Sequence, residues 1–255
     1  MKKTNLKGFW LTLICLVYAS TGFCQHSKPV HIYLVGGAVM ADKPKQQHPE
    51  MGWGTRMNDF FDSTVVVSNK GSNFNLAISA DGELFKSIID SIQKGDYVLI
   101  EPEGNLKPNG GEAALADKGF QRNLQQMITK LKEKQAITVL VTPPASRKFN
   151  PEGKIVPQSL ALNLVLQKTA QKNSVLFIDL TKQSAALIAQ FGPEDSKRLF
   201  NYLEADQNPN YLQGRQDDVH FNEFGARKVA QIILKDLREA FPDLKSRVVK
   251  SNWSK

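Results

Sequence analysis

Cysteine is nearly absent: the 255-residue chain has two, Cys15 and Cys24, and both lie among the first 24 residues. If that segment is removed, the remaining chain has no thiol, which excludes disulfide bonds, cysteine-ligated metals and a cysteine nucleophile. The sequence also lacks the His-x-x-x-His and Asp-x-Asp spacings that are typical of metal sites. We therefore expect no metal and no other cofactor.

A long hydrophobic run is lacking as well, and the apolar stretch near the start (residues 9–17) is short. Three lysines precede this stretch and small residues follow it, which is the pattern of an export signal over residues 1–24. We expect cleavage near Cys24-Gln25, a periplasmic or secreted mature protein, and no stable membrane span after cleavage. Lipid anchoring at Cys24 is the alternative, although Phe23 before it is a poor match to a lipobox.

The formal charge of +8 does not indicate a basic binding face. The signal lysines and the four basic residues of the tail after Leu244 account for all but about one of these charges. Because the positive charge lies at the two ends of the chain, we predict no nucleic-acid partner. The sequence contains no indication of an oligomeric state.

Strand and helix patterns alternate between these ends. Short apolar runs typical of buried parallel strands occur at Val30–Val35, Thr64–Val67, Tyr97–Glu101, Ile137–Thr142 and Val175–Leu180. Three stretches with apolar residues at helical spacing begin at Phe85, Leu124 and Ala226. The alternation predicts an α/β fold, a three-layer, doubly wound sandwich with a mostly parallel five-stranded sheet of flavodoxin-like order. We expect one domain over residues 25–245, followed by a basic tail over residues 246–255.

The first predicted strand runs into the small-residue turn Gly36-Gly37-Ala38, where α/β enzymes often hold an exposed nucleophile. Further blocks follow in order: Met51-Gly52-Trp53-Gly54, Gly95–Ile100, Val141–Pro144 and Asp217–Ala226. Together they resemble the SGNH (GDSL-type) hydrolases, in the branch of the rhamnogalacturonan acetylesterases. The resemblance covers residues 30–240 and implies the SGNH fold.

The resemblance also implies a site. In the family a serine attacks the ester, the histidine of Asp-x-x-His takes its proton, and the aspartate orients that histidine. Those roles correspond to Ala38, His220 and Asp217. The oxyanion hole of the family corresponds to Asn105 and to Gly71.

Several of these positions depart from the family pattern. Gly37 and Ala38 replace the Asp and Ser of the Gly-Asp-Ser turn, so the nucleophilic oxygen is missing, and Gly104 and Leu106 replace a His and an Asp beside Asn105. Ser72 is a substitute nucleophile nearby, but moving the attack by one strand would disturb its angle to His220. We therefore expect a pseudoenzyme that is inactive as a serine esterase.

Three residues are candidates for substrate binding: Trp53, Glu101 and Glu103. An indole at a pocket edge stacks on sugar rings, although packing under the first loop is the other interpretation of Trp53. Two functions stay open for the whole chain. One is a non-catalytic protein that binds an acetylated or pectin-type polysaccharide or pairs with an active paralogue, and the other is an active carbohydrate O-acetylesterase with an altered site.

The export pattern generates a first prediction. Mature protein purified from the native host should begin at or near Gln25, because signal peptidase cleaves after the small-residue region. N-terminal sequencing measures this directly. Intact Met1 on cytoplasmic protein would contradict it.

Overall fold

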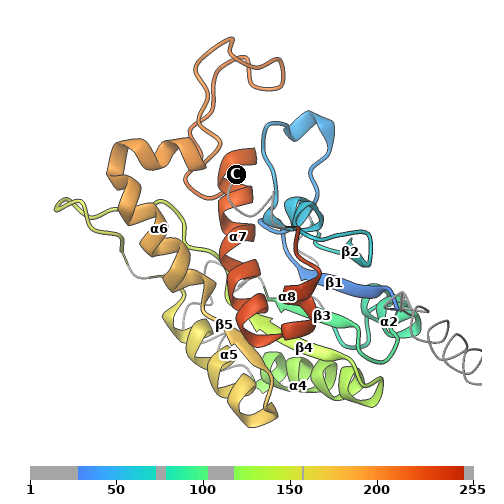
Figure 1. The fold of residues 1–255 in the computed structure, drawn as a ribbon. Coiled ribbons are helices and arrows are strands. Elements are labelled where there is room, and N and C mark those ends of the chain that lie inside the picture. The colour runs from blue at the N-terminus through green and yellow to red at the C-terminus, as the bar shows by residue number, and fades with distance from the viewer. Residues whose placement is uncertain (1–27, 73–78, 103–117, 157, 250–255) are drawn as a thin grey trace, which may run out of the picture.

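The computed structural model describes residues 28–72, 79–102, 118–156 and 158–249, and a five-stranded sheet lies at its centre (Figure 1). All neighbouring strands pair in parallel, which confirms the predicted sheet. In spatial order the strands are β2 (Val65–Asn69), β1 (Val30–Gly36), β3 (Tyr97–Glu101), β4 (Ile137–Val141) and β5 (Leu176–Ile178). The order reverses between β1 and β3, and sheets of this type bind ligands at the carboxyl ends of the strands beside such a reversal.

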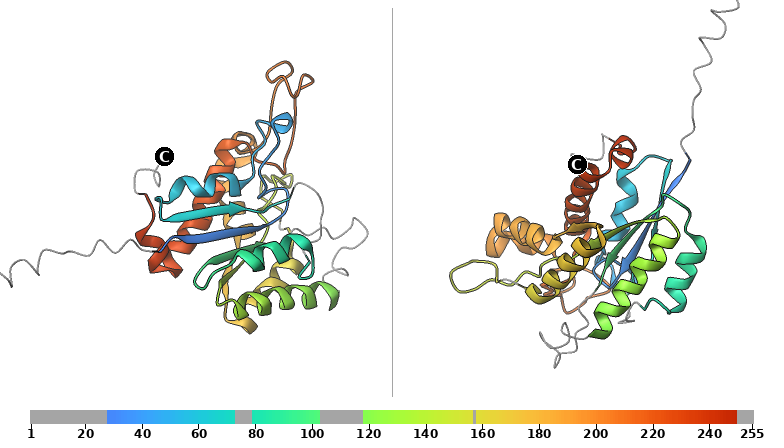
Figure 2. Two further views of the ribbon diagram at one scale, coloured as in Figure 1. Left: turned by 90° about the vertical axis from the view of Figure 1, so that its right-hand side faces the viewer. Right: turned by 90° about the horizontal axis from the view of Figure 1, so that it is seen from below.

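The pleat of the strands divides their side chains between two cores. In β1, Ile32 and Leu34 belong to one apolar cluster, whereas Tyr33 and Val35 belong to the other. Figure 2 shows α7 and α8 on one side of the sheet and α2 and α4 on the other. The helices that bury residues in the second cluster are α2 (Glu83–Ser91), α4 (Lys118–Glu133) and α5 (Leu160–Asn173). Those of the first cluster are η2 (Trp53–Phe60), α6 (Leu180–Asp195), η3 (Ser196–Leu199), α7 (Glu223–Ala240) and α8 (Pro242–Ser246).

The helical periods expected from the sequence form α2, α4 and α7. In α7 the whole predicted stripe from Ala226 to Leu237 is buried, and the side chain of Asn222 caps the helix by accepting the Gly225 N–H at 3.0 Å. The strand predicted over Val175–Leu180 is shorter, because Asp179 already caps α6 through the N–H of Lys182 (3.0 Å). The predicted alternation includes helices beside the last strand, but no apolar stripe was predicted for α5 or α6.

The domain extends past the predicted boundary at residue 245. Arg247 is buried, and its guanidinium donates to the Asp243 carboxylate and to the Thr64 carbonyl, both at 3.2 Å. The N–H of Val249 donates to the carbonyl of Phe60 at 2.9 Å. Residues 246–249 therefore pack against the domain, and the Asp243 carboxylate neutralises the charge of Arg247.

The segment after β1 packs tightly against the beginning of η2. The N–H groups of Trp53 and Gly54 donate to the carbonyls of Val39 and Met40, at 2.9 and 3.1 Å. A Cβ atom on Gly52 would lie 2.2 Å from the Ala41 carbonyl oxygen, so only glycine fits there. Within the described ranges, no helix combines the length and apolar character that crossing a bilayer requires.

This close approach predicts the effect of a single methyl group. Gly52→Ala should lower the free energy of unfolding by about 3 kcal/mol, the upper end for overpacking, because the added carbon meets backbone rather than a movable side chain. Gly82→Ala is the control, since its Cβ would be 3.3 Å from the nearest atom, and it should cost less than about 1 kcal/mol. Urea unfolding compares the two. Equal stability of the two variants would refute the packing argument.

Candidate functional site

The site lies at the carboxyl ends of the central strands, beginning with the turn after β1. The Gly37 carbonyl accepts the N–H groups of Met40 and Ala41, at 3.1 and 3.0 Å, and so closes the turn. Ala38 is half-buried in this turn and presents only a methyl group. The turn is therefore formed as expected, without an oxygen that could attack an ester.

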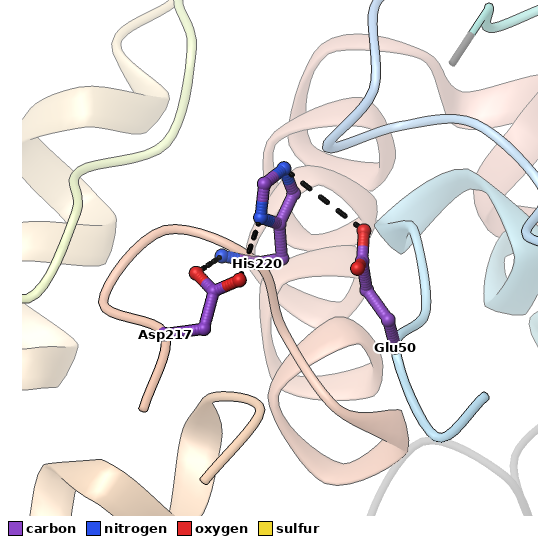
Figure 3. A group of neighbouring side chains, drawn as sticks. All are labelled: Glu50, Asp217 and His220. Atoms are coloured by element: carbon purple, nitrogen blue, oxygen red, sulfur yellow. Dashed lines mark hydrogen bonds and ion pairs between the residues drawn. The ribbon is translucent and has the colours of Figure 1, made fainter. Parts of the chain in front are cut away.

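Asp217 and His220 lie together, as predicted. The side chains meet at 2.9 Å between Asp217 Oδ2 and His220 Nδ1 (Figure 3). Asp217 Oδ1 also accepts the backbone N–H groups of Val219 and His220, both at 2.9 Å. The three-residue spacing is thus used to build a turn in which one carboxylate holds both the backbone and the ring. An ionised carboxylate only accepts hydrogen bonds, so the ring proton resides on Nδ1.

Asp217 carries its negative charge throughout the physiological pH range. Burial is the largest influence and by itself raises the pKa, but it is outweighed by hydrogen bonds from the His220 ring and backbone, from Arg215 and from the Val219 N–H. Together they hold the pKa of Asp217 well below its usual range. The Arg215 guanidinium lies 2.6 Å from Asp217 Oδ2.

A second carboxylate, which sequence reasoning missed, lies on the other side of the imidazole. Glu50 Oε1 is 3.9 Å from His220 Nε2, and Figure 3 shows the ring between the two acids. The same oxygen pairs with Lys43 Nζ at 2.7 Å, and the Lys43 and Glu50 side chains are only 3% and 7% exposed. In sequence these two residues resemble any solvated loop pair. Only the fold, which joins Met51 to Phe221 by a 2.8 Å backbone hydrogen bond, brings them to His220.

Two loops project together beside this cluster, residues 42–50 and residues 203–215 (Figure 1). Asn210 donates through its side-chain amide to the carbonyls of Lys45 and His48, at 2.8 and 2.9 Å. The Tyr211 hydroxyl donates to the Gln47 carbonyl at 2.9 Å. The paired loops form a rim next to the Glu50 carboxylate.

The structure corrects two of the predicted substrate-binding residues. Trp53 is completely buried, and its indole N–H donates to Glu101 Oε2 at 2.7 Å. Glu101 is itself 0% exposed. This pair belongs to the core, where the indole donates to one oxygen of a buried carboxylate, and both side chains are shielded from solvent.

Of the two predicted oxyanion donors, Gly71 and Asn105, only Gly71 lies in the part of the chain that the structure describes. The N–H of Gly71 donates to Asn69 Oδ1 at 3.1 Å, so this hydrogen is already used within its own loop. A Cβ atom on Gly71 would lie 2.8 Å from the Ala41 backbone, which explains the glycine by packing. Glu103, Gly104 and Asn105 lie outside the described residues, as does the export signal.

Comparison with known proteins identifies the family of the chain. The model of the GDSL-like lipase/acylhydrolase family matches residues 26–233. The chain belongs to this family. It lies in the rhamnogalacturonan acetylesterase-like branch, because it is 32% identical over 225 residues to rhamnogalacturonan acetylesterase RhgT of Bacillus subtilis (strain 168). That match covers 87% of this chain and 95% of the relative.

Solved structures share the fold. Protein YXIM of Bacillus subtilis matches with a TM-score of 0.65 and 24% identity, over 84% of this chain and 57% of that one. The acetyl xylan esterase AlAXEase matches with a TM-score of 0.52 and 21% identity, over 83% of this chain and 100% of that one. The matches confirm the predicted α/β fold.

Glu50, Asp217 and His220 present three potential metal ligands within 4.8 Å of one another. Both carboxylates, however, are already paired with a cation, Glu50 with Lys43 and Asp217 with Arg215. A divalent ion would have to displace these partners or be repelled by them. The expectation of no metal stays a prediction.

The depressed pKa of Asp217 predicts how stability depends on pH. Asp217→Asn should lower the free energy of unfolding by about 1.5–3 kcal/mol at pH 7, the range for hydrogen bonds to a charged group. The wild-type carboxylate has a lower pKa folded than unfolded. Its contribution is therefore complete above the unfolded value of about 4 and is lost as the pH falls toward the folded value.

Urea unfolding at pH 7 and pH 3 measures this, with Asp90→Asn, an exposed position on α2, as the control. The gap between wild type and Asp217→Asn should be smaller at pH 3. A gap that does not change with pH would show that the charge of Asp217 is not what stabilises the turn.

Proposed function

We propose that this chain is an exported protein that binds an acetylated or pectin-type polysaccharide and does not cleave its esters by a serine mechanism. One observation carries the proposal: Ala38 occupies the nucleophile position at the end of β1, while Asp217 and His220 keep their hydrogen bond. The basic, apolar and small-residue regions over residues 1–24 support export.

The ligand class is supported by the relatives. RhgT is a rhamnogalacturonan acetylesterase and AlAXEase an acetyl xylan esterase, so the substrates named for both are acetylated polysaccharides. The rim of paired loops and the half-exposed imidazole preserve polar groups beside the end of β1. Such groups suit the hydroxyls of a sugar without requiring a reaction.

Loss of the nucleophile is decisive for the chemistry. The histidine acts by taking the proton of the attacking hydroxyl, and a methyl group has no such proton. Removing the serine from a triad leaves only about 10³–10⁴-fold acceleration over water. His220 is therefore retained as a polar contact and not as the base of an acyl-enzyme mechanism.

An esterase with an altered site is the second candidate, and two observations favour it. His220 is still oriented by Asp217, so its Nε2 could activate a water molecule for direct attack on an acetyl group. The backbone N–H of Ser72 donates to the Gly36 carbonyl at 3.0 Å, which places this serine beside the end of β1. Both routes require His220 as the base.

The two candidates are separated by assays on the mature protein. We expect no labelling by a fluorophosphonate probe, no acetate release from acetylated pectin above background, and no effect of His220→Ala on any trace rate. The wild-type protein should nevertheless bind the same pectin, as measured by calorimetry. Stoichiometric labelling that disappears in Ser72→Ala, or acetate release that disappears in His220→Ala, would establish the altered-site esterase instead.

A further inference from the structure

The imidazole of His220 faces a hydrogen-bond acceptor where an esterase presents a donor. In a catalytic triad, Nε2 meets the hydroxyl hydrogen of serine. Here Nε2 faces the Glu50 carboxylate, with Oε1 at 3.9 Å. That distance is too long for a direct hydrogen bond, but it is the separation expected of two atoms that share one hydrogen-bonded oxygen, about 2.8 Å from each.

Glu50 is held as an acceptor. Its carboxylate is buried and ion-paired, because Lys43 Nζ lies 2.7 Å from Oε1. Each carboxylate oxygen accepts more than one hydrogen bond, so Oε1 keeps a lone pair for a further donor. The charge of Lys43 compensates the carboxylate, and it does so at Oε1, the same oxygen that faces His220.

The protonation state of His220 decides whether its Nε2 accepts or donates a hydrogen bond, but it does not change Glu50 as an acceptor. Asp217 keeps a proton on Nδ1, so Nε2 accepts when the ring is neutral and donates when the ring is charged. Glu50 accepts in both cases. A ligand group placed between them must therefore bring at least one hydrogen-bond donor.

On this basis we propose that Glu50, His220 and Lys43 form a subsite for a free sugar hydroxyl, which rests on the proposed function of glycan binding. A single hydroxyl donates to Glu50 Oε1 and contacts His220 Nε2. When the imidazole is neutral, a vicinal diol supplies one hydrogen-bond donor to Glu50 Oε1 and another to His220 Nε2. An O-acetyl group at the same position has no hydrogen to donate. It leaves the buried carboxylate without its further partner and brings an ester carbonyl toward a negative charge.

The subsite consequently selects the deacetylated form of the polysaccharide. An acetylesterase must recognise the ester. This chain, without a nucleophile, is suited to the hydroxyl that deacetylation leaves behind. Its preference is the reverse of the substrate preference suggested by the names of its relatives.

Isothermal calorimetry on the mature protein tests this with one pectic oligosaccharide in two forms, native O-acetylated and saponified. We expect the saponified form to bind about tenfold more tightly, in line with one hydrogen bond to a charged acceptor. Glu50→Gln keeps the size of the side chain and provides an amide donor for the ester carbonyl. It should reduce the ratio of the two dissociation constants to near one.

A second variant removes the ion pair without leaving a buried charge. The double substitution Lys43→Met, Glu50→Met replaces both charges by apolar groups, a change that buried pairs often tolerate, and it should abolish the preference as well. Glu83→Gln on α2 also breaks an ion pair, 3.0 Å from Lys86, and as the matched control it should leave the ratio unchanged.

The outcomes are distinguishable. Equal binding of the two forms by wild type, tighter binding of the acetylated form, or a preference that survives in both variants overturns the subsite and leaves glycan binding intact. Binding of neither form overturns the proposed function together with the subsite. The comparison of the two ligands uses wild-type protein, so it holds even if a variant does not fold.

Discussion

The arrangement of the site depends on the backbone contact between the turn after β1 and the Gly52–Gly54 segment. Two backbone hydrogen bonds and a glycine that cannot bear a Cβ atom bring these segments together. The buried hydrogen bond from Trp53 to Glu101 then attaches the second segment to the end of β3. Because the chain must leave this contact and return to it, residues 42–50 form a loop over the strand ends, and that loop carries Lys43 and Glu50.

Basic and acidic groups alternate across the site, from Lys43 through Glu50, His220 and Asp217 to Arg215. The successive nitrogen–oxygen distances are 2.7, 3.9, 2.9 and 2.6 Å. In a partly buried environment each charge needs its neighbour, since removing one partner leaves the other uncompensated. Asp217 also holds two backbone N–H groups, so it stabilises its turn independently of catalysis. This accounts physically for an orienting aspartate and histidine that persist where the nucleophile is absent.

Family membership and chemistry therefore give different information about this chain. The fold, the strand order and the Asp-x-x-His turn are those of an acylhydrolase. At the position of the family's nucleophilic serine, however, this chain has Ala38, which carries no hydroxyl oxygen. Glu50, His220 and Asp217 nevertheless keep defined contacts, and in the subsite proposed above their acceptors favour a ligand that donates hydrogen bonds.

Much of this molecule was determined by local sequence. The apolar runs of the strands and the stripe of α7 are set by periodicity, so they were predicted correctly. The pairing of Asp217 with His220 was expected from the family resemblance, and hydrogen bonds between residues three apart close that turn. No apolar face was predicted for α5 and α6, because neither helix has a clear one and because Gly192, at φ +72°, and Pro193 interrupt α6.

Tertiary structure decided the rest. Trp53 and Glu101 are separated by 48 residues, and nothing local shows that an indole will bury a carboxylate. Arg247 belongs to the core because its guanidinium donates hydrogen bonds to the Asp243 carboxylate and to the Thr64 carbonyl. Glu50 reaches His220 from 170 residues away along the chain, since only the packing of the loop after β1 brings its carboxylate to the imidazole. The sequence by itself thus determined the elements and the missing nucleophile, whereas the partners of each buried charge were decided by contacts that exist only in the folded chain.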